Sequence, residues 1–294
     1  MKTKIAAIFY AISAAALYAI NIPFSKVLLQ HVEPTMMASF LYLGAGLGLL
    51  IWGLTEKLTG KGTKREPLTR KELPYTIAMV VLDILAPIFL MIGLTMTNSA
   101  NASLLNNFEI VATSLIALII FKEKISKKLW AAIILVIIAG ILLSFEGQAA
   151  LVFNKGSLFV LAACICWGFE NNCTKMISNK SSVEIVVIKG IFSGLGSLVT
   201  ALIIGEKIPE LIWIGCALIL GFISYGLSIN FYITAQKDLG AAKTSAYYSI
   251  APFLGVIFSI LLGERPAVNF YFALTVIAVS TYLMIKDTLG DKNA

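Results

Sequence analysis

Charged residues are scarce in this chain of 294 residues, because only 13% are Asp, Glu, Lys or Arg whereas 59% are hydrophobic. Together with a mean hydropathy of +0.89, this balance excludes a water-soluble globular domain. No segment matches the phosphate-binding loop that ends in Gly-Lys-Ser/Thr, so ATP does not drive any activity from within this chain. The missing charge indicates a protein that resides in lipid.

Histidine and cysteine are also rare. The single histidine, His31, has no acid or nucleophile patterned around it, and we expect it to be an exposed loop residue. Four cysteines fall in apolar runs with no histidine nearby to complete a metal set, which indicates packing residues: Cys164, Cys166, Cys173 and Cys216. The sequence therefore predicts no metal site and no cofactor.

Apolar runs of about 20 residues recur along the chain, each long enough to cross a hydrocarbon layer of roughly 30 Å. The runs are continuous, whereas the strands of a membrane barrel alternate over short segments. We predict an all-α integral membrane protein with ten transmembrane helices, at about 5–29, 35–54, 74–96, 99–121, 130–146, 156–177, 183–203, 210–236, 241–262 and 267–286. The partner of such a chain is the lipid bilayer.

The formal net charge of +7 reports topology rather than nucleic-acid binding. With ten spans, one face of the membrane has only Lys155, Lys207 and Arg265. The opposite face gathers most of the other basic residues, among them Lys2, Lys4, Lys57, Lys61, Lys64, Arg65, Arg70, Lys71, Lys122, Lys124, Lys127, Lys128, Lys175, Lys180, Lys237, Lys243, Lys286 and Lys292. Because cytoplasmic loops carry the excess of Lys and Arg, we expect a multi-pass protein of the cell membrane with both termini in the cytoplasm.

The two halves of the chain match each other. A shift of 149 residues places YAINIPFSKVLLQ (18–30) on WGFENNCTKMISN (167–179), which aligns Tyr18 with Trp167, Ser25 with Thr174 and Lys26 with Lys175. A shift of 141 residues aligns Glu123 with Glu264. We predict two five-helix units, 1–146 and 147–294. Because five is odd, the second unit enters the membrane from the opposite side, and an inverted repeat of this kind is typical of transporters.

The fourth helix of each half, NNFEIVATSLIALIIFKEKIS and YYSIAPFLGVIFSILLGERPA, shows a mid-helix Glu or Pro step and a closing acidic residue. These segments resemble the drug/metabolite transporter superfamily, in particular its EamA branch. The first half departs from the family's pattern with Ile110 and Val111 in place of Pro and Lys122 in place of the closing Gly. In the second helix of each half, Phe40 and Lys189 stand where the family often has Arg. The resemblance implies a transporter without naming its substrate.

Three carboxylates lie deep in the predicted spans, where such groups are costly and usually functional. By helical rise Glu109 is about 15 Å from the outer end of its helix, Asp83 about 14 Å from the inner end and Glu170 about 21 Å from the outer end. Each belongs to a polar stripe, such as Asn106, Glu109 and Thr113. We predict a substrate site from the acids and the neighbouring amides and phenols: Glu109, Asp83, Glu170, Asn106, Asn171, Tyr225, Tyr232, Tyr247 and Tyr248.

These features predict a secondary transporter of small metabolites, with amino acids or related amines as the first candidates, in a monomer or homodimer. A proton is a natural coupling ion for Glu109 or Asp83, because burial disfavours a charged carboxyl. Pro23, Pro87 and Pro252 leave carbonyls without a helical donor, which can bind a cation or merely bend the helix. Lys189 can either extend to the interface or pair with a carboxylate.

The alternative functions are an intramembrane enzyme and a passive channel or lipid-moving protein. An enzyme is disfavoured because the spans contain one aspartate and no histidine, so neither an aspartate pair nor a Ser/His dyad can be formed. We therefore predict that the chain is not an enzyme. A channel is distinguished from a carrier by the kinetics of flux.

Overall fold

The computed structural model of the chain describes residues 2–58, 66–122, 126–146, 152–177, 180–239, 244 and 247–290. The first half contains α1 (Lys2–Ala19), α2 (Asn21–Leu28), α3 (Pro34–Leu58), η1 (Arg70–Glu72), α4 (Leu73–Met96), α5 (Ser99–Leu105), α6 (Phe108–Phe121) and α7 (Lys127–Ser144). The second contains α8 (Lys155–Ile177), α9 (Ser182–Ile203), α10 (Leu211–Gly221), η2 (Phe222–Leu227), α11 (Ser228–Leu239), α13 (Ala251–Leu261) and α14 (Val268–Gly290). The predicted helical bundle is confirmed.

One detail departs from the all-helical prediction. The two-residue strands β1 (Phe145–Glu146) and β2 (Val152–Phe153) pair antiparallel between the two halves. Glu146, which we expected at a helix end, therefore lies in a strand. This short pair connects α7 to α8 and leaves the helical architecture unchanged.

Six helical segments of the described residues are long and apolar enough to cross a membrane: Ile5–Leu28, Pro34–Glu56, Arg70–Met96, Ser99–Ile120, Ser182–Ile203 and Leu211–Ala235. The other four predicted ranges are occupied by α7, α8, α13 and α14. The central polar residues Glu170, Asn171 and Asn172 lower the hydropathy of α8, although its 23 residues give it ample length. The total of ten spans remains a prediction.

The surface of the bundle carries many large apolar side chains that water would not tolerate in such number. Examples that are more than half exposed are Phe9, Ile51, Ile77, Ile119, Phe192, Ile219 and Phe272. They come from helices in both halves of the chain. An apolar exterior is what contact with the hydrocarbon of a bilayer requires.

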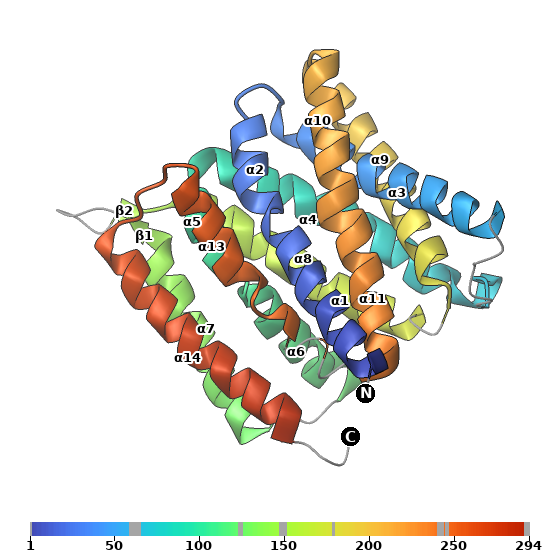
Figure 1. Cartoon of the computed structure of the whole chain (residues 1–294). Coiled ribbons are helices and arrows are strands. Elements are labelled where there is room, and N and C mark those ends of the chain that lie inside the picture. Colours follow the sequence, from blue (N-terminus) through green and yellow to red (C-terminus); the bar gives the residue numbers. More distant parts are fainter. Residues whose placement is uncertain are drawn as a thin grey trace.

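Helices of one half pack mainly against helices of the other. The main neighbours are α3 with α9, α4 with α8, α7 with α14, α1 with α11, and α5 with α13. In Figure 1, α7 and α14 form one edge of the bundle, and the start of α1 and the end of α14 lie at the same end. An even number of membrane crossings would place them so.

Glycines allow neighbouring helices to approach closely on both sides of α3. A Cβ at Gly44 would lie 2.0 Å from the carbonyl oxygen of Leu218 on α10. A Cβ at Gly190 on α9 would lie 2.4 Å from the backbone nitrogen of Gly46. No real side chain fits at such distances, so α3 contacts both neighbours through its backbone.

Several predicted helices are broken rather than continuous. The range 5–29 is divided at Ile20, where Pro23 has no N–H to donate to the Ala19 carbonyl. The range 99–121, which we predicted as one helix, is divided at a turn formed by Asn106 and Asn107. There Asn107 donates both its backbone N–H and its side-chain amide to the Leu104 carbonyl, each at 3.1 Å, and this local bonding replaces the helical pattern.

The second half has corresponding irregularities. Within the predicted range 210–236, a π-helical segment, η2, separates α10 from α11, and such segments often mark functional sites. In the predicted range 241–262, the described residues 249–250 form a turn and α13 begins at Ala251. Pro252, predicted to bend a helix at its centre, instead lies in the first turn of α13, where a missing N–H costs nothing.

His31 is exposed between α2 and α3, as predicted. Its ring stacks on Trp213 of α10, with ring centroids 3.8 Å apart and planes 3° from parallel. This contact joins the two halves at the end of the bundle opposite the start of α1.

Candidate functional site

An ion cluster occupies the interior of the bundle. Lys189 of α9 places its Nζ 3.1 Å from Oδ2 of Asp83 on α4 and 2.9 Å from Oε1 of Glu170 on α8. Both carboxylates are buried, and the lysine side chain is 12% exposed. Lys189 therefore pairs with carboxylates instead of extending to the interface, and one ammonium group serves two acids that are distant in sequence.

The cluster is held by hydrogen bonds from neighbouring helices. The Tyr42 hydroxyl of α3 donates to Oδ1 of Asp83 at 2.9 Å, and the Trp167 indole N–H approaches the Tyr42 oxygen at 3.4 Å. The Thr174 hydroxyl donates to Glu170 from one turn away on α8. Buried charges are tolerated when they are paired and hydrogen-bonded in this way.

Glu109, the third predicted acid, lies at the start of α6 in a separate polar group. The Asn171 amide of α8 donates to Oε1 of Glu109 at 2.7 Å and to the Thr113 hydroxyl oxygen at 3.3 Å. Asn171 follows Glu170 directly in the sequence, so α8 connects this group to the ion cluster. Glu109 is half-buried, whereas Asp83 and Glu170 are fully buried.

The predicted stripe of Asn106, Glu109 and Thr113 does not lie on one continuous helix, because Asn106 belongs to the turn before α6. At this turn the Asn106 side-chain amide donates to the Tyr18 hydroxyl oxygen at 3.1 Å. Glu109 and Thr113 remain together with Asn171. The helix break therefore separates one predicted stripe into two hydrogen-bonded groups.

Tyrosine rings extend from the ion cluster through the bundle. Tyr225 lies 5.1 Å from Tyr42 and 5.9 Å from Tyr18, measured between ring centroids. Tyr248 lies 5.8 Å from Tyr18 and 5.0 Å from Tyr232. Three of the four tyrosines predicted for the site thus belong to one ring cluster. Among the described residues, Tyr247 makes none of these ring contacts, because α-helical spacing directs it away from its neighbour Tyr248.

Asn21 is a site residue that the sequence analysis missed. Its amide donates to the Tyr225 hydroxyl at 3.0 Å, and its Oδ1 accepts from Ser25 at 3.3 Å and from Ser224 at 3.4 Å. The 149-residue shift aligns Asn21 with Glu170 and Ser25 with Thr174. The alignment of the halves was the signal that could have found it.

Tyr42, Tyr18 and Trp167 were also missed as site residues. Tyr18 and Trp167 were aligned by the shift but were not assigned a role, and Tyr42 is an aromatic residue in an apolar run. In the sequence, an aromatic residue that lines a site cannot be distinguished from an aromatic residue that faces lipid. Only the packing of α3 against its neighbours places the Tyr42 hydroxyl on Asp83.

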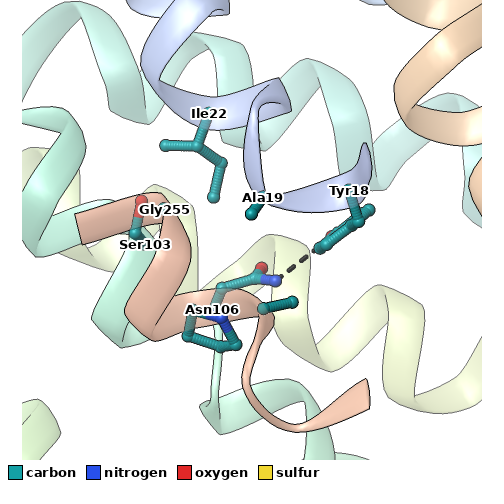
Figure 2. Close-up of a pocket in the computed structure, with 8 residues that line it drawn as sticks. Tyr18, Ala19, Ile22, Ser103, Asn106 and Gly255 are labelled. Atoms are coloured by element: carbon teal, nitrogen blue, oxygen red, sulfur yellow. Dashed lines mark hydrogen bonds between the residues drawn. The ribbon is translucent and has the colours of Figure 1, made fainter. Parts of the chain in front are cut away.

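A small cavity lies beside the tyrosine cluster (Figure 2). Its lining comes from the broken helices: Tyr18, Ala19, Ile22, Ser103, Asn106, Ala251, Pro252 and Gly255. The space that the centre of a water molecule can occupy is about 10 Å³, which is room for one water-sized particle. Figure 2 shows the hydrogen bond between Asn106 and Tyr18 at one side of this cavity.

An apolar helical bundle with buried ion pairs and interrupted helices is the architecture of a polytopic membrane transporter. The chain matches the EamA-like transporter family over residues 5–145 and again over residues 154–286. These two matches cover nearly the whole chain, and the chain belongs to this family. The resemblance inferred from the fourth helix of each half is therefore confirmed.

Two relatives support the same class. An uncharacterized transporter of Methanothermobacter thermautotrophicus is 25% identical over 272 residues, which are 87% of this chain and 78% of that protein. The uncharacterized transporter YyaM of Bacillus subtilis is 21% identical over 250 residues, 81% of this chain and 80% of that protein. A solved crystal structure at 14% identity covers 98% of both chains with a TM-score of 0.71, which shows a shared fold.

Proposed function

We propose that the chain is a secondary carrier for small metabolites that bear an amine, such as amino acids, and that it works by alternating access between its two halves. The observation that carries this proposal is the buried cluster of Asp83, Lys189 and Glu170, with Glu109 alongside. This cluster lies where α4 and α6 of the first half meet α8 and α9 of the second.

The charge balance of the cluster favours a cationic group. Among the described residues, the ammonium group of Lys189 contacts two carboxylates, Asp83 and Glu170, and a third carboxyl group, that of Glu109, lies nearby. Of the three acids, Glu109 is partly exposed, and no described lysine forms an ion pair with it. A substrate amine that binds Glu109 would complete the charge balance, and a bound proton would do the same, so substrate and proton would compete for this carboxylate.

The tyrosines add a second element of recognition. The rings of Tyr18, Tyr225 and Tyr248 lie within one cluster, and their faces attract ammonium groups as well as apolar substrate parts. The hydroxyl groups of Tyr18 and Tyr225 are held by the amides of Asn106 and Asn21. This fixed polar frame is suited to a solute that has both an amine and hydrogen-bonding groups.

The packing of the halves supports alternating access. In the predicted order of spans, α3 with α9, α5 with α13 and α7 with α14 are pairs of equivalent helices, and each pair packs together. Such pairing is what two units related by a two-fold axis in the membrane plane would show. We also propose that both termini lie on the cytoplasmic side of the cell membrane, because the lysine and arginine residues are concentrated on that side.

Carboxylates also join the halves at the end of the bundle opposite the start of α1. Glu206, after α9, accepts hydrogen bonds from the backbone N–H groups of Thr35 and Met36 at 3.0 and 2.7 Å. Glu264, after α13, accepts from the N–H groups of Ser99 and Ala100 at 2.8 and 2.9 Å. These two caps hold helix starts of the first half to loops of the second, and they are contacts that a rocking motion would break.

Binding of amines tests the proposed substrate class. We expect a set of free amino acids and amines to contain members that raise the melting temperature of the purified protein in a saturable way, because a ligand stabilises the state that binds it. The N-acetylated form of the same compound, which has no positive charge, should give no increase. Equal stabilisation by the charged and acetylated forms would remove the amine from the proposal.

A further inference from the structure

Two tyrosine hydroxyl groups inside the bundle accept a hydrogen bond but do not donate one. The Tyr225 oxygen accepts from the Asn21 amide at 3.0 Å, and the Tyr18 oxygen accepts from the Asn106 amide at 3.1 Å (Figure 2). Among the described residues, neither hydroxyl donates to an acceptor. A donor inside a protein that lacks an acceptor costs free energy. These two O–H groups are therefore available to a ligand.

Neighbouring side chains set the direction of these two hydrogen bonds. Oδ1 of Asn21 accepts from the Ser25 hydroxyl at 3.3 Å, which leaves the amide nitrogen of Asn21 for Tyr225. Oδ1 of Asn106 lies 3.9 Å from the sulfur of Cys164, whose thiol can donate to it. Because both amide nitrogens donate to the phenols, each phenol has its single proton left to donate elsewhere.

Two other tyrosines of the ring cluster differ in this respect. The Tyr42 hydroxyl donates to Oδ1 of Asp83 at 2.9 Å. The Ser228 hydroxyl donates to a backbone carbonyl of α1 at 2.8 Å, so the contact of 3.5 Å between the Ser228 and Tyr248 hydroxyls uses the proton of Tyr248. The protein itself therefore provides acceptors for these two tyrosines.

The two available donors lie beside the proposed amine position at Glu109. The rings of Tyr18 and Tyr225 are 5.9 Å apart between centroids. The backbone N–H of Glu109 donates to the Asn106 carbonyl at 3.1 Å, so the residue that holds Tyr18 is one turn away from Glu109. Both phenols lie within electrostatic range of the Glu109 carboxylate. A small molecule with two polar groups can thus contact the carboxylate with one group and the phenols with the other.

We propose that the hydroxyl groups of Tyr18 and Tyr225 donate to the carboxylate of the substrate, whose amine binds Glu109. This inference rests on the proposed function and narrows its substrate class from amines to amino acids. Hydrogen bonds to a charged acceptor are stronger than those between neutral groups, and two donors match the two oxygens of a carboxylate. Because the amine and the carboxylate carry opposite charges, such a substrate adds no net charge to the site.

The test compares the affinity of the purified full chain for each standard amino acid with its affinity for the amine that lacks the carboxylate. The shift in melting temperature over a concentration series gives both affinities. We expect the best-bound amino acid to bind about ten-fold or more tightly than its amine. Tyr18→Phe and Tyr225→Phe each remove one O–H and keep the ring. Each should lower the affinity for the amino acid by about ten-fold, with a much smaller effect on the amine.

Tyr10→Phe is the matched control, because Tyr10 lies on the same helix as Tyr18, is 36% exposed and packs its ring on Phe231. It should keep the full preference for the amino acid. Equilibrium dialysis with labelled compounds gives the affinities where a variant melts early.

Two results would overturn this inference and leave the amine site at Glu109 standing. One is equal affinity of the wild type for amino acids and their amines, which would mean that the two phenols bond to water. The other is an unchanged preference for the amino acid in both Phe variants. If neither class of compound stabilised the protein, the proposed function itself would be contradicted, and this inference with it.

Discussion

Replacing Lys189 by methionine is expected to destabilise the protein by about 3–5 kcal/mol, because it leaves two buried carboxylates without their common partner. Methionine keeps the apolar length of the side chain, so the packing of α9 changes little and the lost charge dominates. Thermal unfolding of the purified protein measures this effect directly. Uptake of the substrate amine should be lost in the same variant, since Asp83 and Glu170 would be held apart or protonated.

The reverse experiment distinguishes charge from packing. If Asp83→Asn and Glu170→Gln are added to Lys189→Met, the ion cluster itself becomes neutral and most of the lost stability should return, because the penalty came from unpaired charge. Lys128→Met is a suitable control, because Lys128 is exposed at the start of α7. This variant should have the melting temperature of the wild type. An unchanged melting temperature in Lys189→Met would contradict the buried ion cluster.

Replacing Glu109 by glutamine is expected to remove the part of uptake that a proton gradient drives, by about ten-fold or more, while the protein remains folded. Glutamine retains an oxygen that accepts the hydrogen bond from Asn171, so the local structure is preserved. It cannot gain or lose a proton, and it cannot form an ion pair with an amine. Uptake into proteoliposomes with and without an imposed pH gradient gives the measurement.

The control for this variant is Glu210→Gln, at the exposed start of α10, which should leave both the proton-driven and the passive component intact. Asp83→Asn tests the other proton-coupling candidate. Full proton coupling in Glu109→Gln together with loss of coupling in Asp83→Asn would indicate that the coupling proton binds in the ion cluster instead. Full coupling in both variants would end the proposal of a proton-driven carrier.

The sequence predicted the interior polarity well for a physical reason. A carboxylate in the middle of an apolar run is visible in the sequence because hydrocarbon does not tolerate it, and the structure buries Asp83 and Glu170 within the protein. The same reasoning left Lys189 with two interpretations, since a lysine about 9 Å from a helix end can extend to the interface or pair inside. Deciding between them required the packing of α9 against α4 and α8.

The helix interruptions and the neutral site residues were harder to predict. The turn at Asn106 and Asn107 depends on a side-chain hydrogen bond to Leu104, which competes with the helix without changing its hydrophobic pattern. Asn21 enters the site only through its contact with Tyr225 far away in sequence, and Tyr42 only through the packing of α3 against α4. Periodicity identifies the buried face of a helix but not the helix that it meets.

Counterflow in proteoliposomes tests the proposed carrier most directly. Vesicles that contain the protein are loaded with a high concentration of an unlabelled amine that stabilises it, and a trace of the same labelled compound is added outside. A carrier that opens to one side at a time should accumulate the label inside transiently above its equilibrium level. Each unlabelled molecule that is carried out leaves the binding site open to the outside, where it binds a labelled molecule and carries it in. Label that only rises steadily to equilibrium would indicate a channel and would contradict alternating access.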